Sequence, residues 1–299
     1  MIISVTERQL FKRCRRKWDY SSFNRQSLVP VINSPALDLG TLIHQVLATW
    51  TQDQLLDPEE VYASLSMNHL KDIMVSYEQR IGCKPSKEEL TPQVEAIALG
   101  ANMIRNYKDH WHTPLPPGFS LVENEQTLIQ PIPNTEHMLE AQLDGIMADE
   151  HGQLFIIERK TFSRAPSVEE LDRKDQFLAY MWILQRSLPD KYIVGVAYDG
   201  LRKRDKPPAG KPLADLFIRR ITLRNKHELR EFEQYLTLEA LDMCDPNVRL
   251  YKNELVLGGC WDCNFRDLCD AESRNENVNN ALLMYHRVNR KEWRDGSQC

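Results

Sequence analysis

Hydrophobic residues recur every three to four positions over much of the first third of the chain, which is the spacing of one helix face. This pattern predicts a helix over residues 6–20, with Thr6 and Gln9 as a capping box at its start. It predicts a second helix over residues 39–50 and a largely helical region from residue 58 to about residue 110. The first third is therefore expected to be helical.

Glycine and proline interrupt this helical region. Residues 82–85 and 91–92 predict two breaks in the long helical stretch, and the Pro-Leu-Pro-Pro-Gly segment at 114–118 is a stronger breaker. Because the hydrophobic spacing changes after this segment, we expect it to end the N-terminal helical region.

Beyond the breaker, short apolar or alternating runs predict strands. The expected strands cover residues 119–130, 138–148, 154–160, 192–198 and 216–222. Helices are expected over 167–188 and 226–243. The order of three strands, a helix and two further strands predicts an α/β or α+β core around one mixed sheet flanked by helices.

The composition is that of an ordinary globular protein. Of 299 residues, 42% are hydrophobic and 27% are charged, which excludes a disordered, collagen-like or coiled-coil chain. There is no apolar run of roughly 18 residues and no secretory leader, so we expect a cytoplasmic protein without membrane association. The net charge is 38 − 43 = −5, which excludes a basic coat but leaves local basic patches open.

Two carboxylates and a lysine share one predicted hairpin. Glu158 and Lys160 lie two residues apart on a strand and therefore point to the same face. A short turn joins this strand to the preceding one, so Asp144 is expected beside Glu158. Carboxylate oxygens bind Mg²⁺ or Mn²⁺, and a lysine can orient or deprotonate a metal-bound water. A surface hairpin with a charged rim is the alternative explanation.

Two further elements add to this hypothesis. His44, in Gly-Thr-Leu-Ile-His, could supply an imidazole ligand, although a lone helical histidine is more often structural. Gln176 and Tyr180 share one helix face and could position a phosphate or a base edge, although such a pair is more often part of the core.

Cysteine spacing indicates a second centre. The chain carries a C-x2-C-x5-C cluster, and one more cysteine near the start could complete a four-thiolate set. The four residues are Cys14, Cys260, Cys263 and Cys269. A reducing compartment disfavours disulfides, so an iron–sulfur cluster or zinc is expected, with free core thiols as the remaining alternative.

Together these motifs resemble those of the PD-(D/E)XK nuclease superfamily, in its RecB-like iron–sulfur branch. That branch includes the CRISPR-associated RecB-like exonucleases and the AddB nuclease domain. The resemblance covers residues 4 to about 273 and rests on six motifs in the same order. They are Cys14, Gly40-x3-His44, Asp144, Glu158-x-Lys160, Gln176-x3-Tyr180 and the C-x2-C-x5-C cluster.

The resemblance implies a function and a role for each motif. It implies a restriction-endonuclease-like core that hydrolyses DNA, with metal ligation by His44, Asp144 and Glu158 and catalysis assisted by Lys160. Gln176 and Tyr180 would contact DNA near the active site. The four cysteines would hold a [4Fe–4S] cluster that joins the C-terminus to the first helix. Single-stranded DNA or duplex ends are the expected substrates, in recombination, repair or DNA processing, alongside an unidentified helicase or recombination partner.

Three regions are expected on this basis. Residues 1–117 would form the N-terminal helical region carrying Cys14 and His44. Residues 118–245 would form the nuclease core, and residues 246–299 the C-terminal cysteine cluster and tail, packed with the N-terminus as one unit.

Two groups of basic residues could contact DNA phosphates. One surrounds Cys14, and the other lies in the loop 202–212. They consist of Lys12, Arg13, Arg15, Arg16 and Lys17, and of Arg202, Lys203, Arg204, Lys206 and Lys211. Each could equally be a solvated surface. Two alternatives to a nuclease remain at this stage: a non-catalytic DNA-binding or adaptor subunit on the same fold, and a zinc-stabilised protein.

Overall fold

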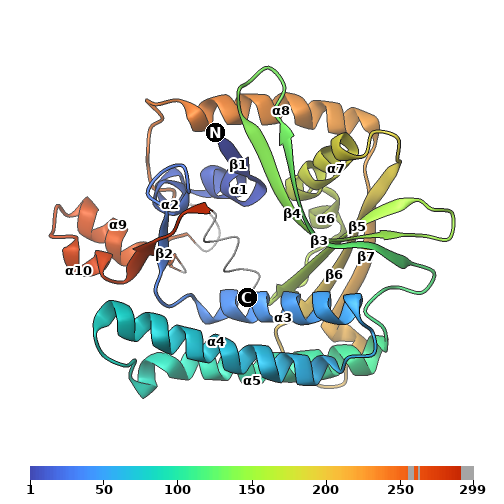
Figure 1. The fold of residues 1–299 in the computed structure, drawn as a ribbon, viewed down its shortest axis with the longest axis horizontal. Helices are drawn as coiled ribbons and strands as arrows, with labels where there is room; N and C mark the ends of the chain where they lie inside the picture. Colours follow the sequence, from blue (N-terminus) through green and yellow to red (C-terminus); the bar gives the residue numbers. More distant parts are fainter. Residues whose placement is uncertain (255–258, 262, 291–299) are drawn as a thin grey trace.

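A mixed sheet is the centre of the structure, a computed structural model that describes residues 1–254, 259–261 and 263–290. Within these residues, six strands pair in the order β1-β4-β5-β6-β7, and β3 also pairs with β4 (Figure 1). They are β1 (Ile2–Ser4), β3 (Ser120–Pro131), β4 (Met138–Ala148), β5 (Leu154–Phe162), β6 (Ile193–Arg202) and β7 (Phe217–Leu223). β1 is parallel to β4 and β5 is parallel to β6, whereas the other pairs are antiparallel. The predicted mixed sheet flanked by helices is therefore confirmed.

One face of the sheet is covered by α7 (Asp175–Ser187) and α8 (Lys226–Cys244), with α1 (Val5–Arg13) beside them (Figure 1). These helices and the strands bury the largest hydrophobic cluster, because their apolar residues meet at the spacing of one helix face. Its members include Leu143, Ile156, Phe177, Val196 and Phe232.

A second layer consists of α3 (Pro35–Gln52), α4 (Pro58–Ile81) and α5 (Lys87–Trp111), in which α4 and α5 run side by side (Figure 1). Its core continues onto the ends of β6 and β7. Gly100 allows the close approach of α5, since a Cβ there would lie 2.0 Å from the Tyr62 hydroxyl.

The N-terminal helices differ from the expected single helix over 6–20. Cys14 has an extended backbone (φ −162°) and separates α1 from α2 (Arg15–Ser21). At this break the Arg16 amide donates to the Tyr251 carbonyl at 3.2 Å, so contact with the C-terminal segment replaces a helical bond.

The prediction of a Thr6–Gln9 capping box is also wrong. The capping box at this helix start is formed by Ser4 and Glu7 instead. The predicted break at residues 91–92 is wrong as well, because Pro92 lies inside α5. Next to Pro92, the buried Gln93 binds the helix to the segment before α3, because its Nε2 donates to the Asn33 carbonyl at 2.8 Å. The predicted break at 82–85 is confirmed by the left-handed Gly82 (φ +83°).

The helix predicted over 167–188 is divided into α6 (Val168–Asp172) and α7. Lys174 is extended at the junction (ψ 113°), and the Arg224 Nη2 donates to the Leu171 carbonyl at 3.0 Å. The Leu171 carbonyl thus accepts from the Lys174 amide at 3.2 Å and from the distant Arg224, and the helix does not continue past this point.

The C-terminal segment lies against the N-terminal one. It contains α9 (Arg266–Ser273), α10 (Asn279–Leu282) and β8 (Tyr285–Arg287), which pairs with β2 (Leu28–Pro30). A small hydrophobic cluster around Tyr20 and Phe265 fills this contact. The remainder of the predicted tail, residues 291–299, lies outside the described residues.

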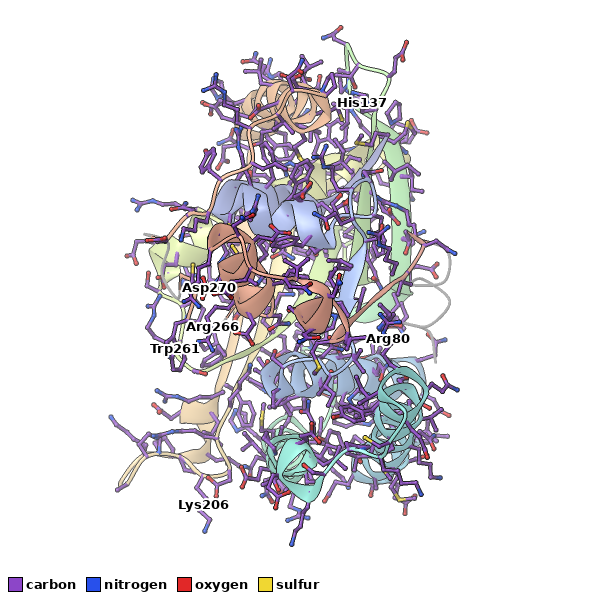
Figure 2. All side chains as sticks on the ribbon, turned by 90° about the vertical axis from the view of Figure 1, so that its left-hand side faces the viewer. Arg80, His137, Lys206, Trp261, Arg266 and Asp270 are labelled. Carbon is purple, nitrogen blue, oxygen red and sulfur yellow. The ribbon has the colours of Figure 1, made fainter. Side chains whose placement is uncertain are left out.

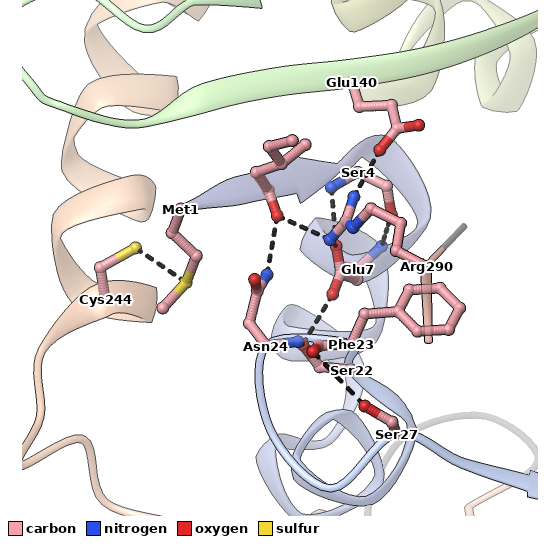
Figure 3. Close-up of polar contacts among 11 residues, drawn as sticks. Met1, Ser4, Glu7, Ser22, Phe23, Asn24, Ser27, Glu140, Cys244 and Arg290 are labelled. Atoms are coloured by element: carbon pink, nitrogen blue, oxygen red, sulfur yellow. Dashed lines mark hydrogen bonds and ion pairs between the residues drawn. The ribbon is translucent and has the colours of Figure 1, made fainter. Parts of the chain in front are cut away.

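Arg290 fastens this segment to the start of the chain (Figure 3). Its guanidinium forms ion pairs with Glu140 on β4 and with Glu7 on α1, the latter at 3.2 Å, and donates to the Ile2 carbonyl at 2.7 Å. The Glu7 carboxylate also accepts from the Ser22 hydroxyl at 2.6 Å. We call Glu7, Glu140 and Arg290 the terminal clasp.

None of the helices in the described residues has the length and apolar character to span a membrane.

Candidate active site

Asp144 and Glu158 meet where the β4–β5 hairpin opens. The last paired residues are Gly145 and Ile157, so Asp144 and Glu158 follow directly in register. The Asp144 Oδ2 accepts the Arg159 backbone amide at 2.7 Å, which takes the place of the next ladder hydrogen bond. The hairpin therefore places the two carboxylates side by side, as its short turn predicts.

Lys160 lies on the same face as Glu158. Its Nζ is 2.9 Å from the Glu158 Oε1. Glu158 is fully buried, and its Oε2 has no hydrogen-bond partner in the described residues. A buried carboxylate oxygen without a partner is costly, so it indicates a position prepared for a cation.

The local charges determine the protonation of these groups. Burial raises the pKa of Glu158, and the neighbouring Asp144 charge adds to this against the opposing effect of Lys160. Burial acts in the same direction on Asp144, but His44, Lys160 and the Arg159 amide hold its pKa well below the usual range. Burial would lower the pKa of Lys160, yet the two carboxylates raise it, so the amine is a cation here.

His44 reaches this group from α3. Its Nδ1 lies 3.4 Å from the Asp144 Oδ1. One turn earlier, Gly40 faces β5, where an added Cβ would make an ordinary van der Waals contact with the Thr161 hydroxyl at 3.7 Å. The predicted histidine thus joins the two carboxylates and the lysine.

Gln176 and Tyr180 lie behind this group rather than on an open surface. The Gln176 Nε2 donates to the Tyr180 hydroxyl at 2.7 Å, and both side chains are more than nine-tenths buried. Burial, with the charges of Glu158 and Asp144, raises the pKa of Tyr180 well above its usual value. In this arrangement the Gln176 amide nitrogen is bonded to the Tyr180 hydroxyl, and the pair lies near the two carboxylates.

Sequence reasoning missed three residues around the site: Glu125 and Lys174 lie beside the carboxylates, and Arg159 follows Glu158 on β5. Glu125 on β3 has φ +46° and is exposed as a whole residue, but its carboxyl group is partly buried, so burial and the Asp144 charge raise its pKa. Arg159 extends to the opposite face and donates from Nη2 to the Thr51 hydroxyl at 2.6 Å. Lys174 lies between α6 and α7, near Glu158 and Lys160. The sequence signal for Glu125 and Lys174 is only an isolated charge beside a strand or helix.

The residue types at the site suit a hard divalent cation. His44, Asp144 and Glu158 would be its ligands, and the unpartnered Glu158 Oε2 fits this role. Across residues 1–254, 259–261 and 263–290, however, no group of three His, Cys, Asp or Glu side chains is arranged to hold a metal ion. Here the Lys160 ammonium group provides the positive charge next to the carboxylates.

The four predicted cluster cysteines line one pocket between α1, α2 and the C-terminal segment. They are Cys14, Cys260, Cys263 and Cys269. Burial raises the pKa of Cys260, and the other three thiols add to the effect. The thiols are thus neighbours, although they too fall short of a metal-binding arrangement among the described residues.

Both predicted basic groups are partly engaged in the fold. In the first, the ion pairs are Lys12–Asp175 at 3.1 Å, Arg15–Asp242 at 2.5 Å and Arg16–Glu272 at 2.6 Å. These pairs bind α1 and α2 to neighbouring elements and so favour a structural role for that group.

In the loop 202–212, Arg202 pairs with Asp215 at 3.0 Å and the Lys203 Nζ donates to the Ala36 carbonyl at 3.3 Å. Three cations of this loop are exposed, and Lys206 points away from the body of the molecule at its tip (Figure 2). They are Arg204, Lys206 and Lys211.

Comparison with known proteins identifies the family. The family model of the PD-(D/E)XK nuclease superfamily matches residues 2–270, which include the hairpin and His44. This chain belongs to that superfamily. No curated protein matches the sequence.

Two solved structures are similar to this chain at low identity. SSO0001 is 16% identical, with a TM-score of 0.38 over 90% of this chain and 86% of the other. A candidate exonuclease from Eubacterium rectale is 12% identical, with a TM-score of 0.45 over 86% of this chain and 91% of the other. The assignment to the PD-(D/E)XK superfamily therefore rests on the family match.

Proposed function

We propose that this protein is a metal-dependent deoxyribonuclease that hydrolyses phosphodiester bonds. The observation that carries the proposal is the convergence of Asp144, Glu158 and Lys160 at the open end of one hairpin, with a buried Glu158 oxygen lacking a partner. The superfamily match makes nuclease chemistry the expected use of this group.

Each residue would have a separate role. His44, Asp144 and Glu158 would hold Mg²⁺ or Mn²⁺, which when bound polarises a phosphoryl oxygen and acidifies a water. Lys160, held as a cation by Glu158, would orient the attacking water and stabilise the charge that develops on the phosphate. The water oxygen would form a bond to phosphorus as the bond to the leaving oxygen breaks, with one water proton released to solvent and one proton taken up from solvent by the leaving oxygen. Gln176 and Tyr180 would support this wall beside the DNA.

Single-stranded DNA or duplex ends are the proposed substrates, with exonucleolytic action in DNA recombination or repair. This finer assignment follows the resemblance to the RecB-like iron–sulfur branch. The exposed cations of the loop 202–212 support a DNA substrate, because they have no acidic partner among the described residues.

End-labelled single- and double-stranded DNA, incubated with Mg²⁺, Mn²⁺ or EDTA, tests the activity. Lys160→Ala should bind DNA and metal but lose at least about 10²-fold in cleavage rate. Asp144→Ala should lose metal affinity as well as activity. Excess Mn²⁺ should therefore partly restore the activity of Asp144→Ala but not that of Lys160→Ala. Lys191→Ala is the matched control, because Lys191 is an exposed lysine just before β6. Wild-type cleavage rates in both site variants would leave a non-catalytic DNA-binding subunit as the better explanation.

We further propose that the four cysteines hold a [4Fe–4S] cluster, supported by their shared pocket. Thiolates are the ligands of such clusters, and the four come from opposite ends of the chain. Anaerobically purified protein should be brown, and Cys263→Ser should lose iron and soluble yield together. Cys83→Ser is the control, since Cys83 is exposed on the turn between α4 and α5. A colourless protein with one equivalent of zinc would contradict the cluster.

A further inference from the structure

Lys174 is a cation beside the candidate active site, and it has no acidic ion-pair partner among the described residues. Its Nζ lies 5.4 Å from the ring centroids of both Phe177 and Tyr198, within the range of cation–π contact. The side chain is partly buried, and no carboxylate forms an ion pair with it in the described part of the chain. The aromatic rings therefore fix the position of the ammonium group without neutralising it.

The acidic residues nearest in sequence are committed elsewhere. Asp172 pairs with Arg220 at 3.6 Å, and Asp175 pairs with Lys12 at 3.1 Å and with Arg8 at 3.4 Å. Glu170 pairs with Arg164 on the loop before α6. Any of these acids could have formed an ion pair with Lys174, but each is paired with another lysine or arginine. Within the described part of the chain, the acidic side chains closest in sequence therefore leave the Lys174 ammonium group available to an anionic ligand.

Lys174 lies close to the carboxylates of the β4–β5 hairpin. Glu158 is the register partner of Tyr198, and Tyr198 is in turn the register partner of Arg220 on β7. Lys174 lies over the Tyr198 ring, one strand away from the carboxylates. Burial lowers the pKa of Lys174, and the charges of Glu158 and Lys160 also act on it, which confirms their proximity.

The two sides of the site also differ in charge. On the β3 side, the exposed Glu125 adds a negative charge next to Asp144. On the β6 side, Lys174 lies over Tyr198, one strand beyond Lys160, and its charge has no ion-pair partner among the described residues. A polyanion is repelled from the first side and attracted to the second.

We propose that Lys174 binds a backbone phosphate of the DNA strand next to the phosphate that is cleaved, so that the strand crosses β6 toward β7. This inference rests on the proposed nuclease function and adds the path of the substrate. Lys174 is a binding residue, and its ammonium group donates a charge-assisted hydrogen bond to one phosphate oxygen.

The test uses the full chain and a fluorescein-labelled oligothymidylate, with binding measured in EDTA over a range of salt concentrations. Lys174→Met keeps the alkyl stem over the two rings and removes the charge. It should bind about tenfold more weakly, as expected for one hydrogen bond to a charged group, and its salt slope should be smaller by about 0.7. Lys174→Arg should restore both quantities, and Lys191→Met is the matched control that should leave both unchanged.

Cleavage of the same oligonucleotide with Mn²⁺ separates binding from chemistry. In Lys174→Met, KM should rise about tenfold with little change in kcat, because a phosphate beside the reacting one is bound equally before and during the reaction. Thermal unfolding should be unchanged. An unaltered salt slope, or a loss that Lys174→Arg fails to restore, would overturn the assignment.

Failure of the proposed function would give a different result. If the wild type binds DNA without cutting it, the nuclease proposal fails, and the binding comparison still decides the role of Lys174. If the wild type binds no DNA, both proposals are wrong.

Discussion

Glu125 on β3 lies beside the candidate carboxylates, and its backbone has a conformation that residues other than glycine rarely adopt. Its φ of +46° is strained for a residue with a Cβ, and strained residues concentrate at functional sites. Since burial and Asp144 raise the pKa of Glu125, its charge acts directly on the site. We predict that Glu125→Gln needs a several-fold higher Mn²⁺ concentration for half-maximal cleavage, because a negative charge that attracts the cation is lost.

A metal titration of the cleavage rate measures this effect. Glu123→Gln is the matched control, because Glu123 is an exposed glutamate two residues earlier on the same strand. An equal shift in both variants would mean that the overall charge of β3, rather than the position of Glu125, sets the metal requirement.

The site could be predicted from the sequence only where its residues are ordered by local structure. The two-residue period of a strand put Glu158 and Lys160 on one face, and the short turn brought Asp144 beside them. Glu125 and Lys174 could not be found this way. Their roles depend on β3 pairing with β4 and on the turn between α6 and α7, and neither contact leaves a periodic signal.

At the scale of elements, Gly100 in α5 makes a sharp prediction about packing. Gly→Ala normally stabilises a helix by about 1 kcal/mol. At Gly100, however, the new methyl group would overlap the Tyr62 hydroxyl, which donates to the Ile97 carbonyl at 3.0 Å. We predict that Gly100→Ala lowers the free energy of unfolding by about 1–3 kcal/mol, the usual cost of overpacking.

Urea denaturation measures this change. Gly40→Ala in α3 is the control, because its methyl group would meet only Thr161 at 3.7 Å. That variant should be as stable as the wild type or slightly more stable. Equal stabilisation by both substitutions would show that α5 can move away from α4 at no cost.

The loop between β6 and β7 gives a second prediction at this scale. Replacing the exposed Arg204, Lys206 and Lys211 by Gln should weaken DNA binding across sequences and reduce its salt dependence, because each lysine or arginine can neutralise a phosphate. Fluorescence anisotropy at several salt concentrations measures the slope.

The remaining two cations of this loop serve as the comparison. Arg202→Gln and Lys203→Gln should mainly change thermal stability, because these side chains are bonded to Asp215 and to the Ala36 carbonyl. A larger effect on DNA binding from this pair than from the exposed three would contradict the assignment.

Element boundaries were predictable where hydrophobic spacing alone decides them. β4 spans 138–148 as expected, and α8 begins at residue 226 as its pattern predicts. The breaks at Cys14 and at Lys174 were missed, because both arise where a carbonyl or amide bonds to a distant segment. The three-residue strands β1, β2 and β8 are too short to show a pattern.

At the scale of the whole molecule, the terminal clasp predicts how the ends are held. Arg290→Ala would leave Glu7 and Glu140, both nine-tenths buried, with neighbouring negative charges and no guanidinium between them. Removing one partner of such a pair costs about 3–5 kcal/mol. We predict a loss of that size in chemical denaturation, together with faster proteolysis of the segment after α9.

Arg287→Ala provides the control, since Arg287 is exposed on β8 of the same segment. Its stability and cleavage pattern should match those of the wild type. If Arg290→Ala behaves in the same way, the packing around Tyr20 and Phe265 is sufficient to hold the C-terminal segment.

The pairing of β1 also bears on the order of events during biosynthesis. Ile2–Ser4 lies parallel to residues 138–140, and the adjoining Glu7 receives its counter-charge from Arg290. Contacts of such long sequence separation form slowly, because a large chain loop must close first. At about 5–20 residues per second on the ribosome, the earliest residues wait several seconds for β4 and longer for Arg290. A nascent chain of this protein therefore keeps β1 without its partner strand until β4 has been synthesised, and keeps Glu7 without its counter-charge until Arg290 follows.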